Sequence, residues 1–397
     1  MGRTSQGIFE TNETPTLFHP AFVLLNLAYF LVFSNVALFY LYPVALDEMG
    51  AGKHTIGWVM GVFSLAAVLS RPLMGVIAAR RGEFLLMSGG MVVMLTASVC
   101  YPFLGSVGAA MLGVRVAHGL GFSGFVAGSF SAVALLFPGE RRAAAYSIVG
   151  ASLMSAMALA PPVGEFLIGR FGFGALFLCA CGLILLAWAS VTGAAGSAGK
   201  AERPRSRRGA PYSRLLGDGS FLLLLTSTLI FAHCQSTLLN FLALAAEQRD
   251  APAGPFFFMA FATAIAVLLT MGRIIDRKGK RRFLRLFYPV FALGLILLPP
   301  FLGGLGQWMP ALLFGLGLGF LFPAHNALAA GYGGRDEKAG VMALFTAVYD
   351  SGFISGAVVS GWIAALLGLD GLFYATGGLA LLGLVVCLGA PIREGGG

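Results

Sequence analysis

Charged residues are scarce in this sequence. Asp, Glu, Lys and Arg together make up 11% of its 397 residues, whereas 58% are hydrophobic. Soluble domains contain about 45–50% apolar residues, and a chain of this length would need more polar surface to stay dissolved. The composition therefore excludes an ordinary soluble protein. Apolar runs of about 18 residues or more, with short interruptions, instead predict repeated membrane-spanning helices.

Cysteine is also rare. The sequence has five cysteines, and all of them lie in apolar runs: Cys100, Cys179, Cys181, Cys234 and Cys387. The closest two, Cys179 and Cys181, would face different sides of a helix. This distribution is typical neither of a disulfide framework nor of a metal site.

Motifs of enzymes and nucleotide-binding proteins are missing. No P-loop or kinase-type glycine loop follows a strand, and no hydrolase or metalloprotease motif occurs. The basic residues behind the net charge of +9 lie in short loops, without the interleaved aromatic residues of a nucleic-acid site. We therefore expect no cofactor, no enzyme activity and no nucleic-acid partner.

Twelve apolar runs are each long enough to cross about 30 Å of hydrocarbon. The first nineteen residues lack the charged start and apolar centre of a cleavable signal peptide, so we expect residues 1–19 to form a cytoplasmic tail. We predict an all-α polytopic membrane protein with spans at residues 20–44, 55–79, 85–104, 107–136, 143–167, 173–193, 221–245, 255–275, 284–304, 307–331, 339–366 and 370–391.

Lys and Arg are distributed unevenly between the two sides of the membrane. If the N-terminus is inside, the outer loops hold only Lys53, Arg170 and Arg249. The inner side holds Arg80, Arg81, Arg141, Arg142, the clusters at 200–214 and 273–285, Arg335, Lys338 and Arg393. Because basic loops stay in the cytoplasm, we predict a multi-pass protein of the cell (inner or plasma) membrane with both termini cytoplasmic.

A segment rich in Gly, Ala, Pro, Ser and Arg divides the chain almost in half. We interpret residues 194–220 as a basic cytoplasmic linker. It joins six-helix bundles at 20–193 and 221–391, and a tail follows at 392–397. Glycines such as Gly75 and Gly272 recur at equivalent points of the two halves. Such a repeat is typical of secondary transporters, whose site lies between the halves near the bilayer midplane.

Three short motifs resemble signatures of the major facilitator superfamily. They are Gly272-x-x-x-Asp276-Arg277-x-Gly279-Lys280-Arg281-Arg282 after the eighth span, Arg115-x-x-His118-Gly119-x-Gly121 in the fourth, and Ala160-Pro161-Pro162-Val163-Gly164 in the fifth. The resemblance covers essentially the whole chain. It implies twelve helices in two pseudo-symmetric halves that rock around a central cavity, with an antiporter-like fifth span and a coupling role for Arg115.

The basic loop of each half is predicted to act as an inner gate; the alternative is that its basic residues only set the topology. Gly272 permits close helix approach, Asp276 can pair with a helix N-terminus or a cation, and Gly279 permits a tight turn. The first-half copy has Ala79 in place of the acidic residue. The predicted gate residues are Gly272, Asp276, Arg277, Gly279 and Arg281, with Gly75, Arg80 and Gly82 in the first half.

Charged residues inside the spans are candidate sites, because a charge at the bilayer centre costs ~2.5–3.5 kcal/mol. Asp350 lies about 15 Å into the eleventh span by helical rise and is the best candidate for a group that binds the coupling proton. The alternative is an Asp held by local hydrogen bonds to Ser351 or Tyr349, or in a fixed ion pair. Arg115 keeps its charge and is expected to hold an anion, to act on a nearby acid, or to form a structural pair. Glu165, near the outer end of the fifth span, is either a second proton site or solvated surface.

Uncharged polar residues inside the spans define a candidate substrate cavity. Histidine titrates near neutral pH, but a lone helical histidine also serves as a packing residue, and both interpretations stay open. Tyr40 either contacts a ligand or belongs to the interfacial aromatic belt. The cavity candidates are Tyr29, Asn35, His118, His233, Gln235, Asn240, His325 and Asn326; Pro161, Pro162 and Gly164 are the predicted hinge of the fifth span.

The favoured function is proton-coupled efflux of a small organic molecule by a protein that works as a monomer. Proton-driven uptake of a small metabolite is the alternative within the same class. A membrane sensor or assembly partner that transports nothing is the alternative from another class. The expected partners are the substrate, protons and the lipid bilayer, with no metal ion.

Overall fold

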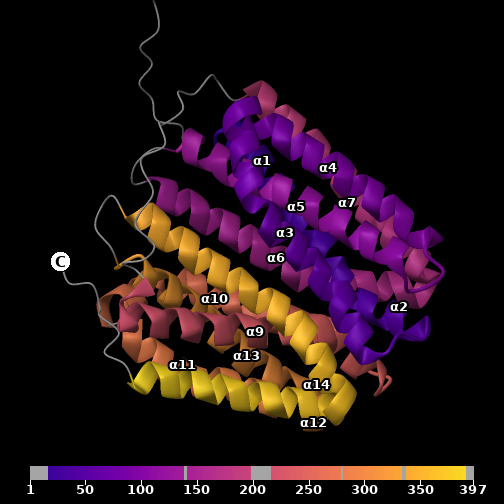
Figure 1. Cartoon of the computed structure of the whole chain (residues 1–397), viewed down its shortest axis with the longest axis vertical. Coiled ribbons are helices and arrows are strands. Elements are labelled where there is room, and N and C mark those ends of the chain that lie inside the picture. The colour runs from indigo at the N-terminus through magenta and orange to yellow at the C-terminus, as the bar shows by residue number, and fades with distance from the viewer. Residues whose placement is uncertain (1–16, 138–140, 198–215, 279, 333–336, 390–397) are drawn as a thin grey trace, which may run out of the picture.

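The structure is a computed structural model that describes residues 17–137, 141–197, 216–278, 280–332 and 337–389. These residues form helices joined by short turns, and they contain no strand (Figure 1). The predicted all-α fold is therefore confirmed. Within the described part of the chain, nine helical stretches are long and apolar enough to cross a membrane.

The first half contains six long helical segments. The first begins as α1 (Pro20–Leu38) and continues through the 3-10 turn η1 (Phe39–Leu41) into α2 (Tyr42–Glu48). The other five are α3 (Lys53–Arg81), α4 (Glu83–Cys100) with η2 (Tyr101–Phe103), α5 (Ala109–Leu136), α6 (Arg141–Phe171) and α7 (Phe173–Ser197). α7 extends to Ser197, four residues beyond the predicted end of the sixth span at 193.

The second half repeats this pattern. Its segments are α9 (Gly219–Glu247), α10 (Gly254–Lys278), α11 (Lys280–Ile296) with α12 (Leu298–Phe301), η3 (Leu305–Gln307) with α13 (Trp308–Ala329), and α14 (Lys338–Gly389). α14 is two helices joined at Gly368, whose φ of 72° and ψ of 176° interrupt the helix. Because a positive φ favours glycine, the break occurs where the sequence predicts a turn between 366 and 370. With α14 counted as two, the described residues form the twelve predicted helices.

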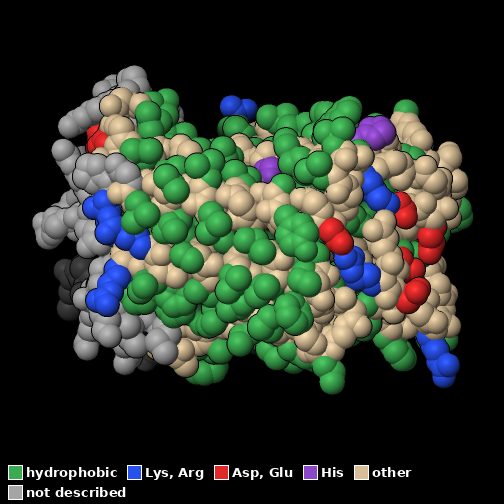
Figure 2. Space-filling view, turned by 90° about the horizontal axis from the view of Figure 1, so that it is seen from below, with side chains coloured by type: hydrophobic (Ala, Val, Ile, Leu, Met, Phe, Trp, Pro, Cys, Tyr) green, Lys and Arg blue, Asp and Glu red, His purple; other side chains and the backbone are tan. Residues whose placement is uncertain are grey.

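The two halves lie side by side, with the first half at the top of Figure 1 and the second below it. α7 ends and α9 begins at the same end of the bundle, which we call the linker end. The opposite end, where α3 and α10 begin, is the far end. On the face shown in Figure 2, hydrophobic side chains cover the middle and most charged side chains lie toward the two ends.

Large apolar side chains remain exposed on several of the long helices. Leu69, Leu178 and Leu269 are 71%, 75% and 74% exposed. Exposure of so many leucines to water would be unfavourable, whereas contact with lipid tails is not. The surface is therefore that of a multi-pass membrane protein.

Candidate functional site

Three sets of helices join the two halves. α3 packs against α14, α6 packs against α10, and η1 and α2 pack against α9. A site between the halves must therefore lie among these elements. Their contacts differ along the bundle axis, from the far end to the linker end.

At the far end, α3 and α14 touch backbone to backbone. A methyl group added at Gly57 would come within 2.6 Å of the Ala357 carbonyl oxygen and 2.9 Å of the Gly361 Cα. One added at Gly61 would come within 2.5 Å of the Val358 side chain. Small residues permit this close approach of helices inside a membrane. The far end is therefore closed between α3 and α14.

The far end is also closed between α6 and α10. The Glu165 carboxylate on α6 accepts hydrogen bonds from the backbone N–H of Ala253 at 2.7 Å and of Gly254 at 2.9 Å. These two residues stand at the start of α10 in the other half. The structure thus places Glu165, a candidate proton site, between the halves.

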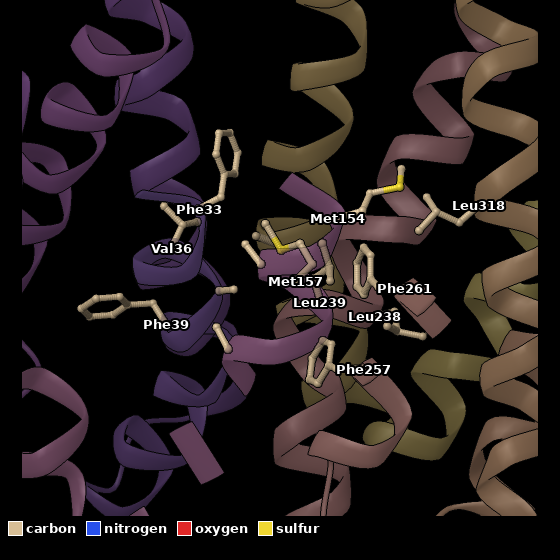
Figure 3. Packing of buried hydrophobic residues seen from close by; sticks show 14 of the residues in the cluster. Phe33, Val36, Phe39, Met154, Met157, Leu238, Leu239, Phe257, Phe261 and Leu318 are labelled. Carbon is tan, nitrogen blue, oxygen red and sulfur yellow. The ribbon is translucent and has the colours of Figure 1, made fainter. Parts of the chain in front are cut away.

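The centre of the interface is apolar. Met154 and Met157 of α6 lie among Phe257 and Phe261 of α10, and all four side chains are buried (Figure 3). Methionine adapts its shape to its neighbours, and aromatic rings offer flat apolar surfaces. A chamber opened between these side chains would suit apolar parts of a ligand.

A few polar side chains adjoin this apolar centre. The Tyr349 hydroxyl on α14 donates a hydrogen bond of 2.8 Å to the Gln235 side-chain oxygen on α9. Tyr40 stacks on Phe257 across the halves, with ring centroids 6.3 Å apart. The structure therefore places Tyr40 between the halves, in agreement with the ligand-contact interpretation.

Two further cavity candidates on α9 are satisfied within the second half. His233 Nδ1 lies 3.0 Å from the Ser355 hydroxyl oxygen of α14. The Asn240 amide donates to the Ser236 backbone carbonyl at 2.8 Å. Both side chains are buried, so they line the second half's side of the interface only if these bonds open.

Toward the linker end, an ion pair joins the halves. The Arg71 guanidinium of α3 pairs with the Asp350 carboxylate of α14, with side chains 32% and 14% exposed. The other two described ion pairs, of Lys53 with Asp47 and of Arg249 with Asp370, each lie within one half. Asp350, the best proton candidate, therefore has a charged partner in the opposite half.

Arg71 was missed in the sequence, although the rule that selected Asp350 also applies to it. It is a charged residue inside the predicted span 55–79, and it precedes Pro72, which lies inside α3. A proline removes one helical hydrogen bond and so weakens the helix at that point. The missing information was the distance between the two residues, which only the packing of α3 on α14 supplies.

The spacing of these contacts shows that α3 and α14 separate toward the linker end. Arg71 stands about 21 Å along α3 from Gly57, and Asp350 stands about 17 Å along α14 from Gly361. Backbone contact at the far end gives way to a bridge made by a long side chain. Beyond it, a methyl group added at Gly75 would meet no atom within 4 Å. The two helices are thus in contact at the far end and apart at the linker end.

Arg115 lies inside the first half rather than between the halves. Its Nε donates to the Val59 backbone carbonyl at 3.1 Å, and its guanidinium carbon lies 5.1 Å from the Phe63 ring centroid. The side chain is 2% exposed, and among the described residues no carboxylate lies within ion-pair distance. Carbonyl dipoles and aromatic faces are therefore its described partners.

The replacement of Arg115 by Met is expected to leave the folded protein about as stable as the wild type. A buried charge without a partner of opposite sign is often replaced by an apolar residue of similar volume at no cost. The replacement by Lys should destabilise more, because a compact ammonium group loses the planar contacts to carbonyls and rings. Thermal unfolding of the two variants in detergent checks this order. A Met variant that melts far below the Lys variant would contradict it.

Asn35, His118 and Tyr101 form a buried cluster within the first half. His118 Nε2 lies 3.0 Å from the Asn35 side-chain oxygen, and its Nδ1 lies 3.2 Å from the Tyr101 hydroxyl. Tyr29 packs nearby against Phe125, with ring centroids 5.3 Å apart. These candidates hold α1, α4 and α5 together, as the packing interpretation of a lone histidine expects.

His325 has a similar place in the second half. Its Nε2 lies 2.8 Å from the Ser227 hydroxyl, its Nδ1 lies 2.8 Å from the Leu321 carbonyl, and the Tyr288 hydroxyl is 3.3 Å away. Asn326 follows it on α13 and is half-buried. Each half therefore contains a histidine cluster that is closed off from the interface in this conformation.

The predicted loop and hinge residues are only partly described. In the first-half loop, Gly82 ends α3 with a φ of 101°, Arg80 is exposed and Gly75 has open space around it. In the fifth span, α6 runs through Pro161 and Pro162 without a break. In the second-half loop, the side chains of Asp276 and Arg277, the surroundings of Gly272 and all of Gly279 lie outside the described residues, and Arg281 lies in the first turn of α11.

Comparisons with known proteins agree with this architecture. A family model described as Major Facilitator Superfamily matches residues 22–332. The chain is 27% identical over 364 residues to the inner membrane transport protein YajR of Escherichia coli, across 87% of this chain and 76% of that protein. It is 24% identical over 357 residues to the multi-drug resistance efflux pump PmrA of Streptococcus pneumoniae, across 84% and 86% of the two chains.

Solved structures share the fold at low sequence identity. A mutant of the nucleoside transporter NupG superposes with a TM-score of 0.78 at 12% identity, across 93% of this chain and 99% of that one. The human organic anion transporter MFSD10 superposes with a TM-score of 0.65 at 18% identity, with the same coverage. The chain therefore belongs to the major facilitator superfamily, whose members are membrane transporters and not enzymes.

Proposed function

We propose that the protein exports small apolar or amphipathic organic molecules from the cell in exchange for protons, and that it does so as a monomer. The observation that carries the proposal is the ion pair between Arg71 and Asp350, which joins the two halves partway along α3 and α14, on the linker side of the glycine contact. It connects a group that can bind a proton to the interface that must open and close.

The proposed orientation places the linker end in the cytoplasm, because the loops at that end carry most of the Lys and Arg residues. The structure is then an inward-facing state, closed outside by the contact of Gly57 with Gly361. Alternating access requires that this contact opens and that the linker end closes. Both halves keep their internal packing during such a movement.

In the proposed coupling step, the Asp350 carboxylate alternates between two partners, Arg71 and a proton. When it is ionised, it pairs with Arg71 across the halves. When it binds a proton from the outer side, the charge is neutralised and the Arg71 guanidinium is released from the pair. A proton delivered to the cytoplasm restores the pair. Proton binding and the contact between the halves are thus linked at one residue.

The proposed substrate class follows from the side chains at the centre. Met154, Met157, Phe257 and Phe261 offer apolar contacts, and the Tyr349 and Gln235 pair offers one donor and one acceptor. The relative PmrA is named a multi-drug resistance efflux pump, which supports export of molecules of this class. Apolar chambers with few polar groups bind ligands mainly through shape and contact area.

Proteoliposomes with an imposed pH gradient test the proposal. The probes are ethidium, a lipophilic aromatic cation, and a neutral dye of similar size. With the interior acidic, we expect the accepted probe to accumulate inside while protons leave, as reported by a trapped pH dye. With the exterior acidic instead, accumulation of the probe together with proton entry would establish uptake. Probe binding without any flux would favour the sensor alternative.

A further inference from the structure

The Glu165 side chain of α6 accepts two hydrogen bonds from the second half. Its two carboxylate oxygens each accept one N–H, from Ala253 and from Gly254, where α10 begins. The first N–H groups of a helix have no partner within the helix and carry partial positive charge. An ionised carboxylate is therefore a strong partner for this position.

The same place shows a very close backbone contact between the halves. A methyl group added at Gly254 would come within 2.7 Å of the Pro162 Cα and within 2.7 Å of the Glu165 carboxylate. Pro162 and Glu165 are on α6, in the first half, whereas Gly254 is on α10. The carboxylate thus closes a contact that only a glycine allows.

The other side chains around Glu165 are mostly apolar. Leu159, Val163, Phe166, Phe258 and Trp308 line an apolar hollow of 520 Å³ beside it. Among the described residues, no Lys or Arg forms an ion pair with Glu165. In such apolar surroundings a charge-assisted hydrogen bond is stronger than in water. The described role of this carboxylate is therefore to hold the second half.

We infer that Glu165 is the latch of the far end: its carboxylate holds that end shut and must release the start of α10 when the end opens. This rests on the proposed alternating access. In the sequence, Glu165 was interpreted as a second proton site or as solvated surface. The geometry instead points to a positioning residue that sets the balance between the two conformations.

The latch predicts that changes on either half shift this balance in the same direction. Glu165→Gln keeps the shape of the side chain but can accept only one of the two hydrogen bonds. Gly254→Ala places a methyl group against Pro162 from the opposite half. Glu165→Gln should raise the population of the open far end about tenfold, the effect of losing one charge-assisted hydrogen bond. Gly254→Ala should raise it as well, because its methyl group separates α10 from α6.

Hydrogen–deuterium exchange of the full-length protein in lipid nanodiscs measures this population. The decisive peptides are not those around α10, whose amides would exchange faster after any local loss of the bond. They are the peptides of α3 and α14 around Gly57 and Gly361, on the other side of the interface. In both variants, we expect faster exchange there and slower exchange near Asp350. Asp47→Asn, which breaks an ion pair within the first half at the same end, is the matched control.

Two results distinguish a latch from a local helix cap. If exchange rises only at the start of α10 in both variants, Glu165 is a local helix cap and the inference is wrong. If exchange also rises around Gly57 and Gly361, the latch is supported, whatever the variants transport. The measurement needs neither a substrate nor a proton gradient, so a failure of the proposed export would leave it valid.

Discussion

The replacement of Asp350 by Asn is expected to abolish the exchange of substrate for protons while the protein still folds. Asparagine cannot take up or release a proton, and it cannot form an ion pair with Arg71. Because the Arg71 side chain is 32% exposed, water can solvate the guanidinium once the pair is lost, so the variant should still fold. The fall in activity would therefore reflect the coupling step and not unfolding.

The measurement is proton flux and probe flux in the same proteoliposomes. The variant should show no probe-dependent proton movement, and probe accumulation against its gradient should fall at least about tenfold, which corresponds to 1.4 kcal/mol of lost coupling. Asp370→Asn is the control, because that acid pairs with Arg249 within the second half. Arg71→Gln should also disturb the coupling, since Asp350 then has lost its partner. Wild-type proton exchange in the Asp350 variant would overturn the coupling proposal.

The replacement of Gly57 by Val is expected to lock the far end open and to stop transport. The new side chain would meet the Ala357 carbonyl and the backbone of Gly361, which cannot move aside without separating α3 from α14. Overpacking of this kind typically costs 1–3 kcal/mol, and here the halves can avoid that cost by staying apart. The closed far end would then be the state that becomes rare.

Gly113→Val provides the matched control for this prediction. Gly113 is on α5 toward the same end, and a methyl group added there would meet no atom within 4 Å. Alkylation of a single cysteine placed at Ala357 reports closure, because that residue is buried at the contact. We expect fast alkylation in the Gly57 variant and slow alkylation in the Gly113 variant. Equal rates would show that the glycine contact does not control the far end.

The positions of the helices could be predicted from the sequence, but their rotations could not. Apolar runs of sufficient length define the spans, and the break at Gly368 lies within the predicted turn. Which side of a helix faces its neighbours is a different matter. Lipid and protein interior are both apolar, so the sequence lacks the polar face that orients a helix in a soluble protein.

This limit explains the mixed outcome for the site. Asp350 could be selected because a charge inside a span is costly, whereas its pairing with Arg71 depends on two helices far apart in the sequence. His118 and His325 could be selected from the sequence in the same way, but each histidine forms its hydrogen bonds inside its own half. Glu165 lies near the end of α6, and its bond to the start of α10 required the packing of α6 on α10.

α3 carries the Gly57 contact, the carbonyl held by Arg115 and the Arg71 pair on a single helix. In mechanical terms it is a lever. Arg115 bonds to it near the far end, and Pro72, next to Arg71, weakens its helical hydrogen bonding toward the linker end. In the proposed coupling, a proton that neutralises Asp350 removes the ion pair beside Pro72, and the helix between Gly57 and Arg71 carries the change to the far end, about 20 Å away.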